Sequence, residues 1–209
     1  SDLMQNHSAY NTGKMKNNIW VTDEDGQVQK DFSEASEYLS CISYTDNAIK
    51  TLIEYFKNQS EPTYIIFFGD HQPNLDDGFL EYLFNGKGES ELTTEEMQKR
   101  YTVPFFIWSN QDIEEKTVDA ISLNYLSSFF LKEAGMPLTA FNKYMLDLYE
   151  QIPVVNINGY IDKEGTYYDT SAMKENELLN EYNMLLYNSV MNNNNGVEWA
   201  YELQQETTE

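Results

Sequence analysis

Apolar and polar residues follow one another in blocks that predict a helix and then a strand. From residue 33 to about residue 58, apolar positions recur at near-helical spacing, which predicts one long helix capped by Ser33 or Ser36. The uncharged run 64–68 is too short for a helix and rich in aromatic and β-branched residues, so we expect a strand buried on both faces. A helix followed by such a strand is typical of an α/β layer fold.

The rest of the chain predicts more elements of both kinds. A second strand at residues 103–108 is entered through Pro104, which suits a strand start or a sheet edge. Turn-forming residues predict two hairpins, at residues 19–32 and 154–168. Further helices are expected at residues 78–84, 94–100, 118–134, 141–149 and 175–191. The character of the chain changes near Pro153, so we expect one α/β domain over residues 1–150. A hairpin-and-helix appendage with a frayed acidic tail is expected over residues 151–209.

Composition excludes several classes of function. The chain has 209 residues, 41% of them hydrophobic, which is too much apolar material for a disordered protein. Its formal net charge of −22 disfavours nucleic acids and anionic lipid headgroups as partners. The same field resists an anionic substrate unless a bound cation cancels it locally.

The sequence says little about the cellular compartment in which the protein works. Cys41 is the only cysteine, so no internal disulfide forms, and its place in a helical pattern favours a buried structural thiol. No stretch approaches the roughly 18 apolar residues of a membrane span, and no signal peptide is recognisable. The chain begins with Ser1 instead of Met, so we expect further sequence upstream.

Asp70 and His71 are the strongest candidates for chemistry. They follow the apolar run 64–68 and Gly69, at the strand end where α/β proteins gather their ligands. A carboxylate beside an imidazole suits a divalent metal ion such as zinc or manganese. Two ligands do not complete a catalytic site, so the remaining ligands are either acids that the sequence does not single out or groups outside this chain. His7 is the only other histidine. No Gly-rich phosphate loop or Gly-x-Ser-x-Gly elbow is present.

The ordered set of these segments resembles the alkaline phosphatase and sulfatase superfamily, and most closely its lipoteichoic acid synthase-like branch of phosphoglycerol transferases. Gly69-Asp70-His71 resembles the metal-binding segment of the family. Asn6-His7-Ser8-Ala9-Tyr10 resembles its His-x-Pro-Tyr segment, with Ala9 in place of the proline. The resemblance covers about residues 1–191 and includes the helix with Tyr44-Thr45-Asp46, the strand at 103–108, and the helix at 122–135, where Asn124 replaces a frequent Asp.

The resemblance implies a partial sulfatase-like α/β sheet flanked by helices, and a role for each matched residue. Asp70 and His71 would ligate manganese, magnesium or zinc, and His7 would contact the substrate phosphate or a second metal. The nucleophile of the family, a Thr or Ser, belongs to an N-terminal half that is absent from these residues. No residue of this chain is therefore assigned as catalytic.

The resemblance also implies the function that we expect. The parent protein would be anchored in the cell membrane and would act at its extracellular face, although this part would not itself contact the membrane. It would transfer or hydrolyse a phosphoryl, phosphoglycerol or sulfuryl group, with a phosphoglycerol lipid, a phosphate ester or a sulfate ester as substrate. We expect these 209 residues alone to be inactive. The alternative is a non-catalytic acidic binding module at a cell surface.

Overall fold

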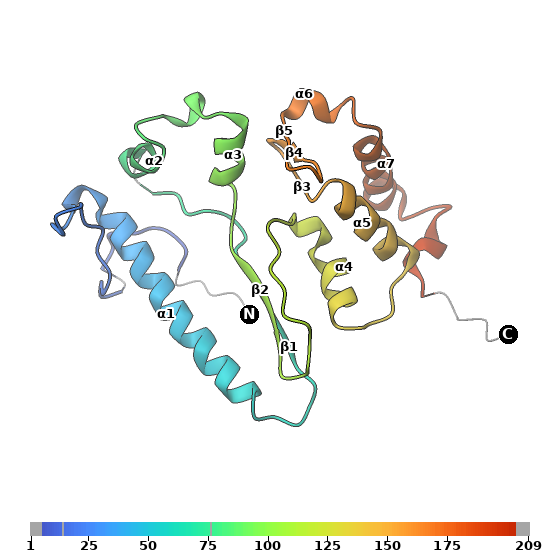
Figure 1. The fold of residues 1–209 in the computed structure, drawn as a ribbon, viewed down its shortest axis with the longest axis horizontal. Coiled ribbons are helices and arrows are strands. Elements are labelled where there is room, and N and C mark those ends of the chain that lie inside the picture. The colour runs from blue at the N-terminus through green and yellow to red at the C-terminus, as the bar shows by residue number, and fades with distance from the viewer. Residues whose placement is uncertain (1–5, 14, 76, 204–209) are drawn as a thin grey trace. The chain divides into compact units, whose positions relative to one another are not determined.

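Two compact units make up the chain, Ser1–Gln111 and Asp112–Glu209. The computed structural model describes residues 6–13, 15–75 and 77–203. The helices and strands are labelled in Figure 1, and the predicted α/β class is confirmed. In the N-terminal unit they are η2 (Lys30–Phe32), α1 (Ser33–Phe56), β1 (Tyr64–Phe68), α2 (Asp77–Leu83), η3 (Glu89–Glu91), α3 (Thr94–Arg100) and β2 (Phe105–Ser109). In the C-terminal unit they are α4 (Leu123–Glu133), α5 (Ala140–Gln151), β3 (Val154–Asn156), β4 (Gly159–Ile161), β5 (Tyr167–Tyr168), α6 (Thr170–Met173), α7 (Glu177–Asn192) and η4 (Glu198–Tyr201).

Strand β1 forms where the sequence predicts it, but not in the expected environment. It pairs antiparallel with β2, from Tyr64 opposite Ser109 to Phe68 opposite Phe105. Phe67 stacks on Phe106 with ring centroids 5.4 Å apart. The side chains of β1 are only partly buried and Phe68 is 47% exposed, so the prediction of a strand buried on both faces was wrong. Burial on both faces needs layers above and below, and a two-stranded ribbon among the described residues does not provide them.

Asn110 fixes the end of α1 to this ribbon. Its side-chain amide donates to the carbonyls of Phe56, Gln59 and Glu61, at 3.2, 3.1 and 2.9 Å. Its side-chain oxygen accepts from the backbone N–H of Thr63 at 2.9 Å. A single amide therefore joins the last residue of α1 and the loop that follows it to Thr63, the residue before β1.

The insertion between β1 and β2 contains the two short helices that the sequence predicts, α2 and α3. Thr93 caps α3 by accepting from the backbone N–H of Glu96 at 3.2 Å, and Glu96 accepts from the backbone N–H of Thr93 at 2.8 Å. Lys87 also donates to Glu96, at 2.6 Å. This reciprocal capping explains why a seven-residue helix is stable at this point of a polar loop.

The expected hairpin at residues 19–32 is reduced to a turn. A single antiparallel bridge joins Thr22 to Val28 within the described residues, and residues 30–32 form η2 instead of a strand. The Asp23 carboxylate accepts from the backbone N–H groups of Asp25 and Gln27, at 3.1 and 2.8 Å. The turn chemistry was therefore predicted correctly, but no strands extend from it.

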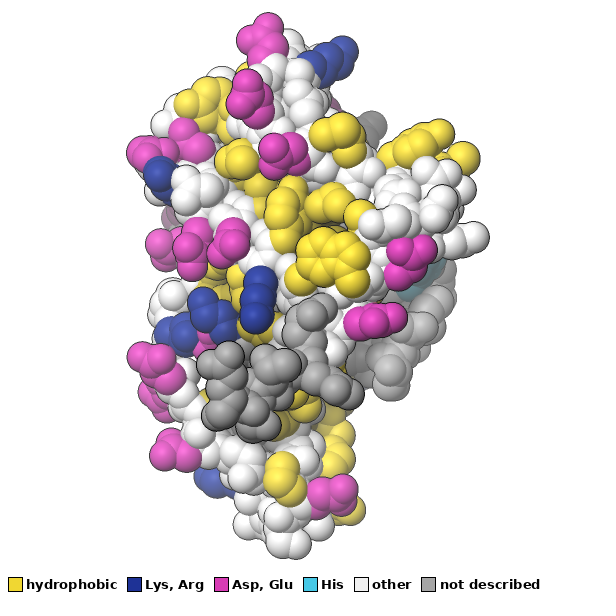
Figure 2. All heavy atoms as spheres, turned by 90° about the vertical axis from the view of Figure 1, so that its right-hand side faces the viewer, with side chains coloured by type: hydrophobic (Ala, Val, Ile, Leu, Met, Phe, Trp, Pro, Cys, Tyr) yellow, Lys and Arg dark blue, Asp and Glu magenta, His cyan; other side chains and the backbone are white. Residues whose placement is uncertain are grey.

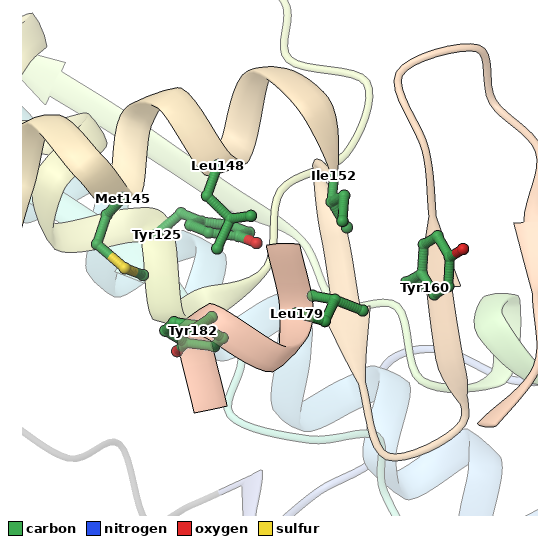
Figure 3. Close-up of a cluster of buried hydrophobic side chains, with 7 residues drawn as sticks. All are labelled: Tyr125, Met145, Leu148, Ile152, Tyr160, Leu179 and Tyr182. Carbon is green, nitrogen blue, oxygen red and sulfur yellow. The ribbon is translucent and has the colours of Figure 1, made fainter. Parts of the chain in front are cut away.

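The core of the C-terminal unit is built by α4, α5, α7 and the sheet β3-β4-β5 (Figure 3). Its buried side chains are Tyr125, Met145, Leu148, Ile152, Tyr160, Leu179 and Tyr182. This core contains residues from both sides of position 150, and the two units meet at residues 111 and 112. The expected boundary at 150 lies inside the C-terminal unit, because α4 and α5 pack against the segment expected to be an appendage.

The expected hairpin at residues 154–168 is a three-stranded antiparallel sheet. Its first predicted strand is divided by a turn, in which the Asn156 side chain accepts from the backbone N–H of Asn158 at 2.9 Å. Gly159 follows at a φ of 135°, and a Cβ there would lie within 1.9 Å of the Tyr168 carbonyl oxygen. The glycine is therefore required by the close approach of β5.

Helix α7 exposes apolar side chains while carrying no charge over most of its length. Between Glu181 and Glu198 the sequence contains no Asp, Glu, Lys or Arg. Met184, Tyr187 and Val190 are 65%, 63% and 76% exposed. Figure 2 shows one face of the molecule, on which apolar side chains gather between scattered carboxylates. No helix in the described part of the chain is long and apolar enough to cross a membrane. The end of the predicted frayed tail, residues 204–209, lies outside the described residues.

Candidate functional site

The loop with Asp70 and His71 leaves β1 directly and is held close to the start of β2. The Gly69 N–H donates to the Pro104 carbonyl at 3.1 Å, which extends the strand pairing by one residue. A Cβ on Gly69 would lie 2.9 Å from the Cβ of Val103, so a larger residue does not fit without movement. The side-chain amide of Gln72 donates to the Thr102 carbonyl. The glycine before Asp70 thus has a steric cause, because the two backbones approach closely here.

Hydrogen bonds to the backbone orient both candidate ligands. The Asp70 Oδ1 atom accepts from the His71 backbone N–H at 2.9 Å. The His71 Nδ1 atom lies 2.8 Å from the Gln72 carbonyl oxygen. A carbonyl oxygen only accepts, so Nδ1 carries the proton and Nε2 of the neutral ring presents a lone pair. Histidines that ligate metals commonly donate their second N–H to a backbone carbonyl in this way.

The two atoms of the pair that could ligate a metal, His71 Nε2 and Asp70 Oδ2, face each other. The His71 Nε2 atom lies 3.6 Å from the Asp70 Oδ2 atom. Two acceptors at this distance repel each other unless a proton or a cation lies between them. Tetrahedral ligation with bonds of about 2.1 Å would separate two such atoms by about 3.4 Å, close to the observed distance. The pair can therefore form one edge of a coordination polyhedron.

This edge does not extend to a complete metal site within the described residues. The side chains of His71 and Asp70 are 67% and 83% exposed. Among residues 6–13, 15–75 and 77–203, no group of three or more His, Cys, Asp or Glu residues is arranged to hold a metal ion. His7 is therefore not brought to Asp70 and His71 as a third ligand. Asp70 and His71 therefore fit as two ligands of a divalent metal, and the described residues do not supply the further ligands of a complete site.

His7 lies in a short loop, residues 6–10, that is fixed at both ends. The Tyr10 hydroxyl donates to the Asn6 carbonyl at 2.6 Å, and the Thr45 hydroxyl of α1 donates to the Asn6 side-chain oxygen at 3.0 Å. The His7 ring is exposed, and its Nδ1 lies 2.7 Å from the Ser8 carbonyl oxygen. Because a carbonyl oxygen only accepts, this contact places a proton on Nδ1 of His7, as in His71.

A set of hydroxyl groups on α1 contacts the preceding segment at residues 6 and 16–21, and we call this set the hydroxyl row. Ser36 contacts Val21, Ser40 contacts Asn18 and Ile19, and Ser43 contacts Asn18. Tyr44 contacts Lys16, and Thr45 contacts Asn6. Five of the hydrogen bonds between the row and the segment reach backbone groups. Such bonds satisfy the polar backbone of a segment that lacks a helix or sheet ladder of its own.

The hydroxyl row was missed by sequence reasoning. Ser33 and Ser36 were expected as helix caps, but the N-cap residue of α1 is Phe32, whose side chain makes no capping bond. The Ser36 hydroxyl instead donates to the Phe32 carbonyl and accepts from the Val21 N–H, each at 3.0 Å. The signal was the spacing of hydroxyl residues at 36, 40, 43 and 44, which places these four on one face of the helix.

The sequence model of the sulfatase family, described as "Sulfatase", matches residues 3–136. A protein of Rhizobium meliloti strain 1021, named for the modification of cyclic beta-1,2-glucan, is 26% identical over 165 residues. That alignment covers 78% of this chain and 26% of the relative.

A solved structure has the same fold over most of the chain. It is the Streptococcus pyogenes phosphoglycerol transferase GacH in complex with sn-glycerol-1-phosphate, with a TM-score of 0.56 and 16% identity. The match covers 88% of this chain and 45% of GacH. The chain thus spans about a quarter of the length of the Rhizobium relative and less than half of GacH. The expected partial sulfatase-like fold is confirmed. The sulfatase match extends over more than half of the sequence and contains His7, Asp70 and His71, so the chain belongs to the sulfatase family.

Proposed function

We propose that this chain supplies Asp70 and His71 to the divalent metal site of an enzyme that transfers or hydrolyses a phosphoryl or sulfuryl group. The observation that carries the proposal is the orientation of the pair: Nδ1 of His71 is bound to the Gln72 carbonyl, and Nε2 faces Asp70 Oδ2 at 3.6 Å. A bound manganese, magnesium or zinc ion would supply positive charge for the transferring group. In this chain, Asp70 and His71 orient their donor atoms for that ion.

His7 has a complementary part in the proposal. Its Nδ1 atom is bound to the Ser8 carbonyl, so the part that we propose for the ring is played by Nε2. When the ring is protonated, Nε2–H can donate to an oxygen of a phosphate or sulfate ester, and when it is neutral, Nε2 can accept or ligate. We propose that the nucleophile and the remaining ligands lie in sequence outside these 209 residues, so that this chain alone is inactive.

A phosphate ester is the favoured substrate class. GacH is named as a phosphoglycerol transferase and is bound to sn-glycerol-1-phosphate, and the Rhizobium relative is named for glucan modification. A phosphoglycerol group carried by a lipid, or transferred to a glycan, is consistent with both names. We further propose that the parent protein is anchored in the cell membrane and acts at its outer face. Proteolysis of intact cells would test this, because a cytoplasmic domain would resist added protease.

The alternative is a non-catalytic binding module, which is favoured by the two-ligand geometry of the described site. Calorimetric titration of the chain with ZnCl₂ and MnCl₂ distinguishes the proposals. We expect weak binding that is lost in Asp70→Ala and retained in Asp25→Ala, a matched change in an exposed acidic turn. Tight binding that survives Asp70→Ala would refute the assignment of the ligands. No binding at any concentration would favour the non-catalytic module.

A further inference from the structure

We infer that Gln72 and Pro73 are positioning residues for His71, because they hold the carbonyl that keeps the proton of the neutral ring on Nδ1. The inference deepens the proposed function and rests on it only for the metal ion that Nε2 would ligate. The two residues complete the segment 69–73, of which the metal assignment uses only Asp70 and His71.

The ring of His71 lies between two acceptors. The Gln72 carbonyl oxygen is 2.8 Å from Nδ1, and the Asp70 Oδ2 atom is 3.6 Å from Nε2. A neutral imidazole has a single N–H, so it donates to only one of them. With the proton on Nδ1, Nε2 offers a lone pair beside the Asp70 carboxylate, and the pair can take a cation. With the proton on Nε2, the N–H faces the carboxylate and occupies the place of the cation. The position of the Gln72 carbonyl therefore decides between an open and a closed pair.

The side chain of Gln72 attaches this carbonyl to a second segment of the chain. Its amide donates to the Thr102 carbonyl. Thr102 is held in turn by the end of α3, because its backbone N–H donates to the Lys99 carbonyl at 3.2 Å and its hydroxyl donates to the Gln98 carbonyl at 3.0 Å. Gln98 is only 4% exposed. Residue 72 is therefore fixed to a buried helix end as well as to its neighbours in the chain.

Pro73 restricts the same residue from the other side. A residue before proline is confined to extended conformations, because the proline ring clashes with its N–H and Cβ in the helical region. Gln72 lies in neither a helix nor a strand, so no regular backbone pairing fixes its conformation. The proline and the bond to Thr102 supply this restraint instead. Together they keep the Gln72 carbonyl beside Nδ1 of His71.

The tautomer of His71 tests the inference without any metal. Ring tautomers are read by long-range ¹H–¹⁵N correlation in ¹⁵N-histidine-labelled chain at about pH 8.5, where histidine rings are neutral. In the wild type we expect His71 to carry its proton on Nδ1. In Gln72→Leu its signals should move towards those of the Nε2–H form. Gln72→Glu should have the same effect, because an ionised carboxylate cannot donate to the Thr102 carbonyl. Pro73→Ala should move the signals part of the way.

Two controls separate positioning from general loosening. Gln27→Leu removes an exposed glutamine side chain elsewhere in the same unit, so it should leave His71 unchanged. His7 is the second histidine of the chain and contacts the Ser8 carbonyl, so its unchanged signals show that the unit remains folded. Calorimetric titration with ZnCl₂ gives a second readout. The zinc affinity should fall about 10–100-fold in Gln72→Leu and stay the same in Gln27→Leu.

The inference is overturned if His71 keeps the Nδ1–H signals in both Gln72→Leu and Gln72→Glu, or if Gln27→Leu moves them equally. A wild-type ring with its proton on Nε2 would also overturn it, as would an unchanged zinc affinity in a Gln72→Leu chain whose tautomer has shifted. Should Gln72→Leu unfold, Gln72→Glu and Pro73→Ala decide by the same signals. A wild-type chain that binds no zinc would refute the proposed function, whereas the tautomer shift would still decide the role of Gln72.

Discussion

Replacing Gly69 by Ala tests whether close backbone approach holds the Asp70–His71 loop in place. The new Cβ would lie 2.9 Å from the Val103 Cβ and 3.2 Å from its Cγ1. Carbon atoms pack best at about 3.5–4.0 Å, so the two segments must separate by about 0.6–1.1 Å. Such overpacking costs about 1–3 kcal/mol. The lower unfolded-state entropy of Ala offsets about 0.4–1 kcal/mol, so the middle of the two ranges gives a net loss of about 1.3 kcal/mol.

Urea unfolding followed by circular dichroism measures this loss, and zinc titration measures its effect on the loop. Gly88→Ala is the matched control, because a Cβ there meets nothing closer than 3.6 Å. It should be neutral or slightly stabilising. Val103→Ala in the Gly69→Ala background removes the Cγ contacts but leaves the Cβ contact, so it should restore only part of the stability. A Gly69→Ala chain as stable as the wild type, with unchanged zinc affinity, would refute the reasoning.

Two further predictions concern other parts of the N-terminal unit. Asn110→Ala removes an amide that donates to three carbonyls, so we expect unfolding in urea to show a loss of about 2–3 kcal/mol, with Asn110→Asp recovering little of it. For Glu96, hydrogen bonds from Lys87 and then Thr93 lower the pKa from 4.5 to about 2. The stability that the Glu96 carboxylate contributes should therefore be present above pH 4.5 and be lost as the pH falls towards 2. Unfolding curves over that range should show a smaller change for Glu96→Gln, and a normal Glu96 titration by NMR would contradict the assignment.

Local patterns predicted the elements well where one segment determines its own structure. In helix α1, apolar residues recur at helical spacing over a long stretch, and β1 is a short apolar run between Pro62 and Gly69. The environment of β1 was not predictable in this way, because it depends on β2, about 40 residues further along the chain. The sequence predicted one strand where the structure has β3 and β4. Asn158-Gly159 is a turn signal between them, but the apolar residues on both sides suggested one continuous strand.

The site shows the same division between local and distant information. Asp70 and His71 were found because they follow a strand end, and their backbone hydrogen bonds are local. The attachment of the His7 loop was missed because Thr45 lies 39 residues from Asn6. Hydroxyl residues in a helix are commonly interpreted as caps or solvent-facing positions, and only the packed segment reveals their partners.

The burial of Cys41 gives the chain a reporter of its own motion. This single thiol lies on α1 beside Tyr10 and is fully buried. A thiol reagent can therefore reach it only when the surroundings of α1 open locally or when the N-terminal unit unfolds. The rate of labelling in the native state, compared with the rate in denaturant, therefore gives the free energy of that opening. Without any engineered residue, the chain therefore offers a measure of how firmly the surroundings of Cys41 on α1 are held.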